Sequence, residues 1–480
     1  MKKRAVIRLL AFLIALTALA MTVPLIMAVC LEEAAMARAF GLAMAAVLLA
    51  VLPVLAATRG QPIRFTASDG FLLVFLAWAG ACITGAVPYY VSGFIPRIAD
   101  AVFESVSGFT TTGSTLITDL EMMPRSLIFW RAETHWLGGM GMVVLTVALL
   151  PLLGVGGFQL LKAETTGPDK DRITPKITGT AKLLWLMYIV LTFLEVLLLR
   201  LAGMDLFDAV IHAFSTIATG GFSSRNESIA YYKSPLVEWI TIIFMIIAGF
   251  NFSLLYRLCR RKFREAFVNS EARAYVLIIA AAVLVIAVSL TAAGGSAADN
   301  IRRGFFYTAS VLTTTGFSCA GHSLWPSLAQ GVLFLLMFIG GCSGSTAGGI
   351  KVIRHVVLFK QMQNELCKII YPRGVFSVQL NNKVGRKDVV YGVSGFIFLY
   401  LFVAAMAALV VASSGLDFYS SFNASLISIG NIGLGLGGLG SPSVFLEFPA
   451  YVKWVLSFVM IAGRLELWTA FVFFSRSYWS

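Results

Sequence analysis

The chain has 480 residues, of which 58% are hydrophobic and only 13% charged. Too little polar surface remains to cover a soluble globule of this length, so the composition predicts a protein that is solvated largely by a lipid bilayer. The net charge of +13 does not indicate a nucleic-acid-binding protein, because the basic residues lie in short connections between apolar stretches and form no patch with interleaved aromatic residues.

Apolar stretches of about 20 residues recur along the whole chain, and each is close to the length of a membrane-spanning helix. They are roughly 5–29, 40–57, 71–91, 128–153, 181–201, 236–258, 274–293, 328–341, 389–411 and 451–474. The first is too long for a signal peptide and lacks a clean cleavage site, so we expect it to be retained as a helix. The sequence therefore predicts an all-α polytopic membrane protein without a soluble domain.

The basic residues also predict an orientation. If the N-terminus is cytoplasmic, most of the 37 Lys and Arg residues fall on the cytoplasmic side, including those of 257–264 and 351–387. This distribution follows the positive-inside rule. We therefore expect a multi-pass protein with a cytoplasmic N-terminus.

Shorter apolar segments of about 10 to 14 residues lie between successive pairs of spans, and they are too short to cross a bilayer. The segments 99–114 and 303–317 both contain Thr-Thr-Thr-Gly, which ends at Gly113 in the first and at Gly316 in the other. Such segments are typical of re-entrant loops, in which a short helix enters the membrane and an irregular segment leaves it.

Two further segments resemble this pair less closely. The segment 208–222 aligns when Gly221 is taken as its glycine, and the segment 422–434 keeps Gly433 but is offset by about a residue and lacks the threonines. In the first three segments a serine then stands at the same distance before the glycine: Ser107, Ser215 and Ser310.

The glycines recur about every 100 residues, which indicates four repeats of span, short helix, glycine loop and span. The expected units are an N-terminal helix pair at 1–65 and pore repeats at 66–160, 161–268, 269–370 and 371–480, the third of which carries an additional irregular segment.

Four irregular loops at membrane depth must be received by protein or by a water-filled cavity, so we expect them to meet around one pore. Their carbonyl oxygens would replace the hydration shell of a monovalent cation, and the short helices would direct their negative C-terminal ends toward it. Tight helix packing is the alternative, since Gly and Thr are common in membrane helix contacts. The candidate cation-binding residues are Thr111, Thr112, Gly113, Thr219, Gly220, Gly221, Thr314, Thr315, Gly316, Asn431, Ile432 and Gly433.

Two features lie beside this pattern. The glycine-rich and hydroxyl-rich segment 340–351 interrupts a span, and it is either an irregular loop or a tight helix-packing site. Arg464 lies within the last apolar stretch, where a charge is costly enough to need a function or an ion-pair partner. The partners considered for a structural ion pair are Glu133, Glu195 and Glu466.

Over essentially its whole length the sequence resembles the TrkH, KtrB and HKT superfamily of potassium transporters, and its N-terminal helix pair is most similar to the TrkH branch. The marks of this resemblance are Ser-Gly-Phe-Thr-Thr-Thr-Gly at 107–113, Ala-Thr-Gly-Gly-Phe at 218–222, Leu-Thr-Thr-Thr-Gly-Phe at 312–317, Asn-Ile-Gly at 431–433 and Gly-Ser-Thr-Ala-Gly-Gly-Ile-Lys at 344–351.

The resemblance implies potassium uptake across the bacterial inner membrane through one pore per subunit, with Gly113 favouring potassium over sodium. It implies a homodimer with cytosolic TrkA-type nucleotide-binding regulatory subunits. It also implies a gate below the filter, formed by an arginine and a loop whose residues here are Gly344, Ser345, Thr346, Ala347, Gly348, Gly349 and Arg464.

The predicted function is therefore selective, gated, channel-like potassium conduction, with potassium as the transported ion and no organic cofactor. A secondary symporter that couples potassium to proton or sodium movement is the alternative. An enzyme is not expected, because the sequence displays no nucleophile with its base, no metal cluster and no paired acids.

Overall fold

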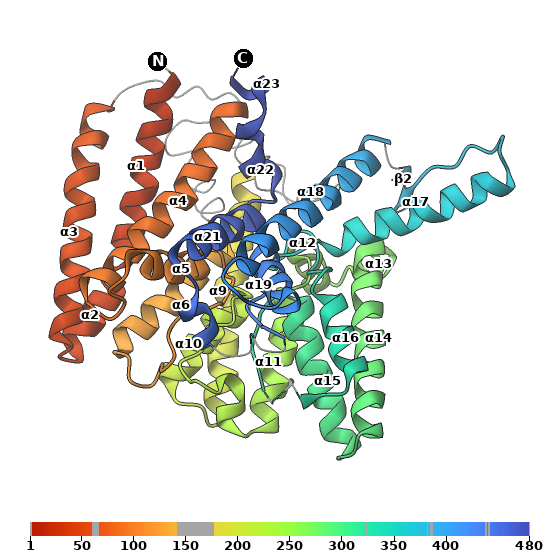
Figure 1. Ribbon diagram of the computed structural model, residues 1–480, viewed down its shortest axis with the longest axis horizontal. Coiled ribbons are helices and arrows are strands. Elements are labelled where there is room, and N and C mark those ends of the chain that lie inside the picture. Colours follow the sequence, from red (N-terminus) through yellow and green to blue (C-terminus); the bar gives the residue numbers. More distant parts are fainter. Residues whose placement is uncertain are drawn as a thin grey trace.

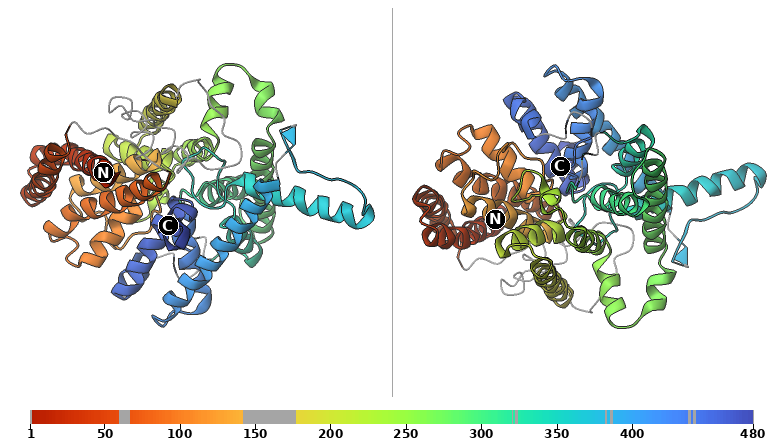
Figure 2. Two further views of the ribbon diagram at one scale, coloured as in Figure 1. Left: turned by 90° about the horizontal axis from the view of Figure 1, so that it is seen from above. Right: turned by 90° about the horizontal axis from the view of Figure 1, so that it is seen from below.

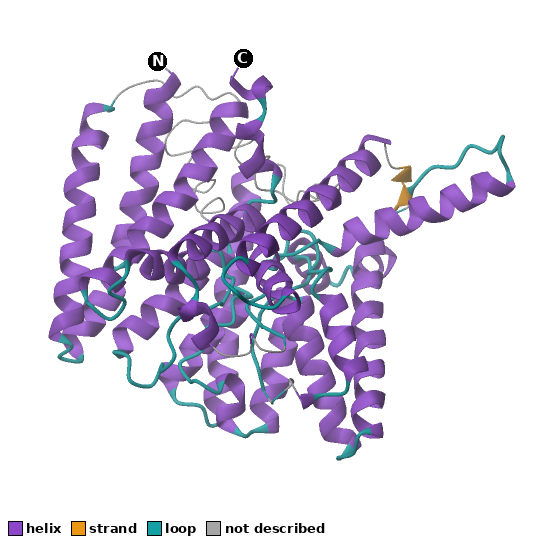
Figure 3. Cartoon of the chain, viewed as in Figure 1, coloured by secondary structure: helices purple, strands orange, loops and turns teal. Residues whose placement is uncertain are grey.

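The computed structural model describes residues 2–59, 67–141, 177–319, 321, 324–381, 383–384, 387–436, 439 and 442–479. These residues are almost entirely helical (Figure 3). Six of their helices are long and apolar enough to cross a membrane, and the number rises to eight when two sharply bent helix pairs each count as one span. The predicted all-α polytopic class is confirmed.

The chain begins with a hairpin at one side of the molecule (Figure 1). It consists of α1 (Lys2–Ala20), α2 (Thr22–Cys30) and α3 (Ala34–Ala57). Small side chains, among them Ala11 and Ala15 of α1, let the two long helices approach closely around Val51. The outer face of α3 carries exposed leucines, as expected of a helix that faces lipid.

Each of the four repeats contains a long first helix, a short pore helix, a glycine loop and a second helix. The first helices are α4 (Ala67–Val91), α9 (Ile177–Leu201), α14 (Ser270–Ala292) and α18 (Lys387–Ala412). The pore helices are α5 (Ile98–Phe109), α10 (Leu206–Ile217), α15 (Ala297–Leu312) and α19 (Phe418–Gly430). The second helices begin with α6 (Arg125–Gly139), α11 (Pro235–Ala248), α16 (Ser327–Leu336) and α21 (Ala450–Arg464).

Local capping helps to set where the pore helices begin. Asp205 caps α10 by accepting the Phe207 N–H, and Asp417 caps α19 by accepting the Ser420 N–H at 3.0 Å. The hydrogen bonds from Ser420 hold the pKa of the exposed Asp417 carboxyl below its ordinary value. Both carboxylates also interact favourably with the positive, N-terminal end of the helix dipole.

The repeats are arranged in a cycle around a common centre, which is visible when the molecule is seen from above or from below (Figure 2). The second helix of one repeat packs against the pore helix of the next: α6 on α10, α11 on α15, and α21 on α5. In the third repeat, Phe334 of α16 contacts Phe422 of α19 with ring centroids 6.5 Å apart. The last repeat therefore closes on the first.

Three of the second helices are broken. This corrects the expectation that the stretches 236–258 and 451–474 form continuous spans, whereas an interruption at 340–351, after the stretch 328–341, was expected. After α11 the chain bends by 106° into α12 (Phe252–Cys259), and after α21 it bends by 118° into the short helices α22 (Trp468–Phe471) and η5 (Val472–Phe474). α16 is only ten residues long. Glycines allow these breaks to pack against the pore helices, since a Cβ at Gly463 would lie 2.1 Å from the Ile429 carbonyl oxygen.

Two predictions fall partly outside the described residues. The stretch 128–153 is described only as far as residue 141, and the expected boundaries after residues 65 and 160 lie in segments that the structure does not describe.

The remaining elements connect the repeats or lie at the C-terminus. α17 (Val352–Ile370) extends well away from the body of the molecule (Figure 1). It leads to a two-stranded antiparallel hairpin, which the sequence analysis did not predict, with Gln379 opposite Val384. The other elements are η2 (Ser228–Tyr232), α13 (Phe263–Val268), β1 (Gln379–Leu380), β2 (Lys383–Val384), α20 (Pro442–Glu447) and α23 (Arg476–Trp479).

Candidate ion pore with filter loops and gate loop

The structure brings all four predicted loops together, and they share one backbone conformation. We call residues 111–113, 219–221, 314–316 and 431–433 the filter loops. The first residue of each loop is left-handed, with φ of 53° at Thr111, 55° at Thr219, 57° at Thr314 and 53° at Asn431. The glycine that ends each loop also has positive φ, namely 83° at Gly113, 82° at Gly221, 85° at Gly316 and 74° at Gly433.

The same hydrogen bond ends each pore helix. The middle residue of each filter loop donates its N–H to the carbonyl five residues earlier, at 2.8 to 3.1 Å. These bonds run from Thr112 to Ser107, from Gly220 to Ser215, from Thr315 to Ser310 and from Ile432 to Ile427.

The fourth filter loop is in register with the others at residues 431–433. The backbone does not show the one-residue offset expected from the sequence, because Ile432 donates to the carbonyl five residues earlier just as Thr112 does, and α19 and α5 each begin 15 residues before their filter glycine. Asn431 replaces threonine at the left-handed position, which asparagine tolerates better than most residues.

The four glycines form a closed ring of close backbone contacts. A Cβ placed on any of them would collide with the carbonyl oxygen that precedes the glycine of the next loop. The distance from the added Cβ to the carbonyl oxygen would be 2.0 Å for Gly113 and Gly220, and 2.1 Å for Gly221 and Thr315. It would be 2.2 Å for Gly316 and Ile432 and also for Gly433 and Thr112. Only glycine fits these positions, both for this reason and because of its positive φ.

The threonine side chains are not equivalent around the ring. The Oγ1 of Thr112 lies 2.7 Å from that of Thr110 and accepts the Asn431 Nδ2–H at 2.9 Å. Thr314 Oγ1 accepts the Gly348 N–H at 2.7 Å. Within the described chain the buried Thr111 hydroxyl has no hydrogen-bond partner. A buried hydroxyl without a partner is uncommon in a folded protein.

The donor set is made of backbone carbonyls and hydroxyl groups. Among the described residues there is no group of three or more His, Cys, Asp or Glu side chains that could hold a metal ion. Neutral oxygen ligands of this kind suit a weakly hydrated monovalent cation that must both bind and leave.

A second ring, which the sequence analysis missed, supports the filter loops from outside. One polar side chain on each pore helix contacts the chain two or three residues after the filter glycine. Glu104 Oε2 accepts the Leu116 N–H at 2.9 Å, His212 Nε2 lies 3.0 Å from Ser223 Oγ, Tyr307 Oη accepts the Cys319 N–H at 3.3 Å, and Asn423 Nδ2 donates to the Leu436 carbonyl at 3.0 Å. We call these four residues the outer braces. The signal for them was a polar residue nine positions before the glycine in three loops.

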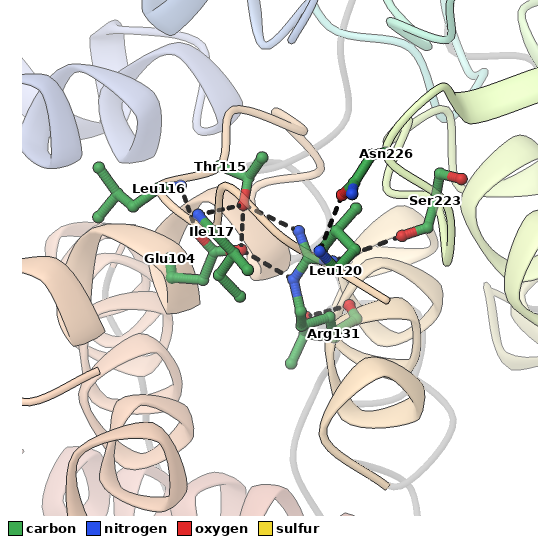
Figure 4. A network of polar contacts seen from close by, with 9 residues as sticks. Glu104, Thr115, Leu116, Ile117, Leu120, Arg131, Ser223 and Asn226 are labelled. Carbon is green, nitrogen blue, oxygen red and sulfur yellow. Dashed lines mark hydrogen bonds and ion pairs between the residues drawn. The ribbon is translucent and has the colours of Figure 1, made fainter. Parts of the chain in front are cut away.

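The brace of the first repeat belongs to a buried ion pair (Figure 4). Arg131 of α6 donates its Nε–H to Glu104 Oε1 at 2.8 Å, and both side chains are at most 1% exposed. Arg131 also donates to Thr115 Oγ1 at 3.0 Å, and its guanidinium lies 4.0 Å from the ring centroid of Phe222. One arginine thus joins the segments that follow the first and second filter loops.

The predicted gate loop, residues 340–349, lies against the filter loops. An antiparallel bridge joins Gly340 to Gly349 and closes the loop. Thr346 Oγ1 donates to the carbonyl of Ile217 at 3.0 Å, at the end of α10. With the bond from Gly348 to Thr314, the loop contacts the second and third repeats directly.

Three side chains outside the loop hold it in place, and the sequence analysis did not single them out. Asn251 Nδ2 donates to the Ser343 carbonyl at 2.6 Å, and Glu271 Oε1 accepts the Ser343 N–H at 2.6 Å. Lys351 Nζ donates to the Ala347 carbonyl at 2.7 Å. The loop is therefore held at Ser343 and Ala347 by polar side chains, and those of Glu271 and Lys351 are buried.

Arg464 connects the gate loop to the first repeat. Its Nη1 donates to the Thr346 carbonyl at 2.7 Å, and its Nη2 donates to the carbonyls of Gly138 and Gly139 at 2.7 and 3.0 Å. Glu466, one of the partners considered from the sequence, instead pairs with Arg354 at 2.5 Å. Arg464 thus places a positive charge beside the loop, with carbonyl groups as its hydrogen-bond acceptors.

The family model described as TrkH, cation transport protein, matches residues 36–480. The chain is 36% identical over 486 residues to the Trk system potassium uptake protein TrkH of Halomonas elongata, with complete coverage of both chains. It is 40% identical over 417 residues to the protein of that name from Escherichia coli K12, covering 86% of each. The crystal structure of the potassium transporter TrkH from Vibrio parahaemolyticus superimposes with a TM-score of 0.90 at 34% identity, over all of both chains. The chain therefore belongs to the TrkH family of cation transport proteins.

Proposed function

We propose that this protein takes up potassium by gated, channel-like conduction through the four filter loops. Its relatives in Halomonas elongata and Escherichia coli are named potassium uptake proteins, which supports potassium as the transported ion. The chain's own contribution is a multi-pass helical body with one cyclic arrangement of irregular loops. No organic cofactor and no enzymatic step enter this proposal.

The observation that carries the proposal is the closed ring of glycine-to-carbonyl contacts. Because each filter glycine touches the carbonyl of the next loop, the four loops position one another, and a change in one displaces its neighbour. A ring of this kind offers carbonyl oxygens from four directions, which is the coordination that a dehydrated potassium ion requires. The uncommitted Thr111 hydroxyl adds one more acceptor.

The gate loop and Arg464 would close the pathway in this conformation. The loop is hydrogen-bonded to Thr314 and to the end of α10, directly below the ring. Arg464 holds the Thr346 carbonyl and adds a positive charge, which raises the electrostatic barrier for a cation. Opening would require the bonds of Thr346 and Arg464 to break together.

The proposed assembly is a homodimer in the bacterial inner membrane, with a cytoplasmic N-terminus and cytosolic TrkA-type nucleotide-binding subunits. α17 supports a bound partner, because it projects from the body of the molecule (Figure 1) and carries exposed apolar side chains. Its large exposed apolar residues are Phe359, Met362, Leu366, Ile369 and Ile370.

The test is potassium and rubidium flux into liposomes that contain the purified protein, combined with single-channel recording in planar bilayers. Conduction predicts discrete current steps, and a current that reverses at the potassium equilibrium potential whatever the proton or sodium gradient. A symporter predicts instead that a proton or sodium gradient drives potassium uptake when potassium is equal on both sides. Gradient-driven accumulation without current steps would replace conduction by coupled transport.

A further inference from the structure

A groove between α1 and α3 lies outside the ion pathway. It has a volume of about 410 Å³, and its walls are mainly apolar. The lining residues are Arg8, Leu9, Phe12, Leu52, Leu55, Ala56 and Arg59. The two arginines lie near the start of α1 and just after the end of α3, which are on the same side of the molecule (Figure 1).

Both arginines lie near the ends of candidate membrane spans. Arg8 lies within the first membrane span, Val6–Cys30, and Arg59 follows the second, Ala34–Ala57. In the part of the chain that the structure describes, neither guanidinium has a hydrogen bond or an ion pair. A charged side chain at this depth extends toward the headgroup region and needs an anionic or aqueous partner.

We propose that the groove binds one anionic diacyl phospholipid. Its phosphate would lie between Arg8 and Arg59, because guanidinium groups recognise phosphate through paired hydrogen bonds. One acyl chain would pack against Phe12, Leu52 and Leu55, which line the same groove. Basic pockets between transmembrane helices are a recurrent way of binding anionic headgroups.

The positive charge of the groove favours an anionic phospholipid over other molecules that could occupy it. Arg4 lies one turn before Arg8 on the same face of α1 and raises the positive potential at the entrance. An apolar helix of a partner protein would fill the groove but leave both guanidinium groups without an anion, and free phosphate would leave the apolar walls uncovered. A phospholipid with a net negative charge satisfies both parts.

The proposal is tested by native mass spectrometry of the full-length protein in detergent, titrated with dioleoylphosphatidylglycerol or dioleoylphosphatidylcholine. We expect one phosphatidylglycerol to bind more tightly than phosphatidylcholine. Replacing both arginines (Arg8→Gln with Arg59→Gln) should weaken the phosphatidylglycerol complex about ten-fold or more, because both charges that attract the anionic headgroup are removed. The matched control, Arg260→Gln with Arg261→Gln, removes two charges from a connection outside the groove and should leave binding unchanged.

A second variant tests the acyl-chain part and does not depend on the arginines. Leu55→Trp keeps both charges but fills the groove, so phosphatidylglycerol binding should fall while thermal unfolding of the lipid-free protein stays unchanged. Equal binding of the two lipids, or equal loss in the control, would identify ordinary annular lipid and overturn the proposal. The proposal would also be overturned if millimolar inorganic phosphate displaced the lipid and Leu55→Trp had no effect on lipid binding. The groove would then bind only the anionic group and not the acyl chain.

Discussion

Gly433, in the last filter loop, lies against the carbonyl oxygen of Thr112, in the first. A Cβ at Gly433 would be 2.2 Å from that oxygen, so the contact tolerates no side chain. The two residues are far apart in the sequence, and their contact joins the fourth repeat to the first. Through this contact the four loops form a ring in which the position of each carbonyl depends on a neighbouring glycine.

Replacing a filter glycine should therefore reduce selectivity. We expect Gly113→Ser and Gly316→Ser each to lower the preference for potassium over sodium about ten-fold, a difference of about 1.4 kcal/mol between the two ions. The added side chain must push away the Gly220 or Ile432 carbonyl. The measurement is the reversal potential in mixed potassium and sodium solutions.

The matched control is Gly93→Ser. Gly93 has φ of 80°, close to that of Gly113, but a Cβ there meets no atom within 4 Å. It reproduces the backbone strain without the collision and should leave selectivity unchanged. Unaltered selectivity in both filter variants would show that the ring does not select the ion.

The sequence alone was sufficient for the helical class, and the helix order and the positive φ values of the four glycines agree with its repeat pattern. These features follow from hydrophobic length and from the narrow conformational preference of glycine, both of which act locally. Gly221 rather than Gly220 was correctly aligned with Gly113, as the equal φ values of Gly113 and Gly221 show. The register of Gly433 was less certain, because the fourth segment lacks the threonines and has Ile427 where the other three segments have a serine.

The contacts between repeats were beyond local reasoning. The Arg464 bonds to Gly138, Gly139 and Thr346 join parts of the chain that only the cyclic packing brings together. The breaks after α11 and α21 were missed, because apolar composition indicates whether a segment is long enough to cross a bilayer but not whether its helix is continuous. Glu104 and Arg131 lie in different helices, and nothing in either helix alone identifies the other as its partner.

The Glu104–Arg131 pair should be important both for stability and for selectivity. Removing one partner of a buried ion pair leaves an uncompensated charge, so Arg131→Met should destabilise the protein by about 3 to 5 kcal/mol. Glu104→Gln with Arg131→Met should be less damaging than Arg131→Met alone. The measurements are thermal unfolding in detergent and the potassium to sodium permeability ratio.

The surface pair Lys368–Glu365 provides the control for charge removal. Its side chains are 42% and 54% exposed, so Lys368→Met should change stability by less than about 1 kcal/mol. If Arg131→Met behaves like this surface variant, the buried network does not hold the two loop segments together.

Arg464 should restrain conduction. We expect Arg464→Ala to increase basal potassium flux about ten-fold, which corresponds to a barrier lower by about 1.4 kcal/mol. The variant removes a positive charge and also frees the Thr346 carbonyl from its hydrogen bond. Arg464→Lys keeps the charge but cannot reach three carbonyls in the same way, so it separates the electrostatic contribution from the structural one.

Thr346→Val tests the gate loop without changing charge. It removes the hydroxyl bonds to Ile217 and Ala248 and should raise flux less than Arg464→Ala does. The control is Ser413→Ala, which removes an exposed hydroxyl outside the gate loop. Wild-type flux in both Arg464→Ala and Thr346→Val would remove the gate from the proposal.

The outer braces should affect selectivity more than stability. Tyr307→Phe removes the hydroxyl that accepts the N–H of Cys319, which lies three residues after Gly316. The lost hydrogen bond corresponds to about 1 kcal/mol of stability. Asn423→Leu does the same for the Leu436 carbonyl in the fourth repeat. We expect both variants to fold and to lower the potassium to sodium permeability ratio less than Gly316→Ser does.

The control is Tyr391→Phe, which changes an exposed tyrosine on α18 and should alter neither the stability nor the permeability ratio. A brace variant that loses stability and keeps full selectivity would assign these residues to the fold alone, because a filter held by its own ring of glycines needs no outer support.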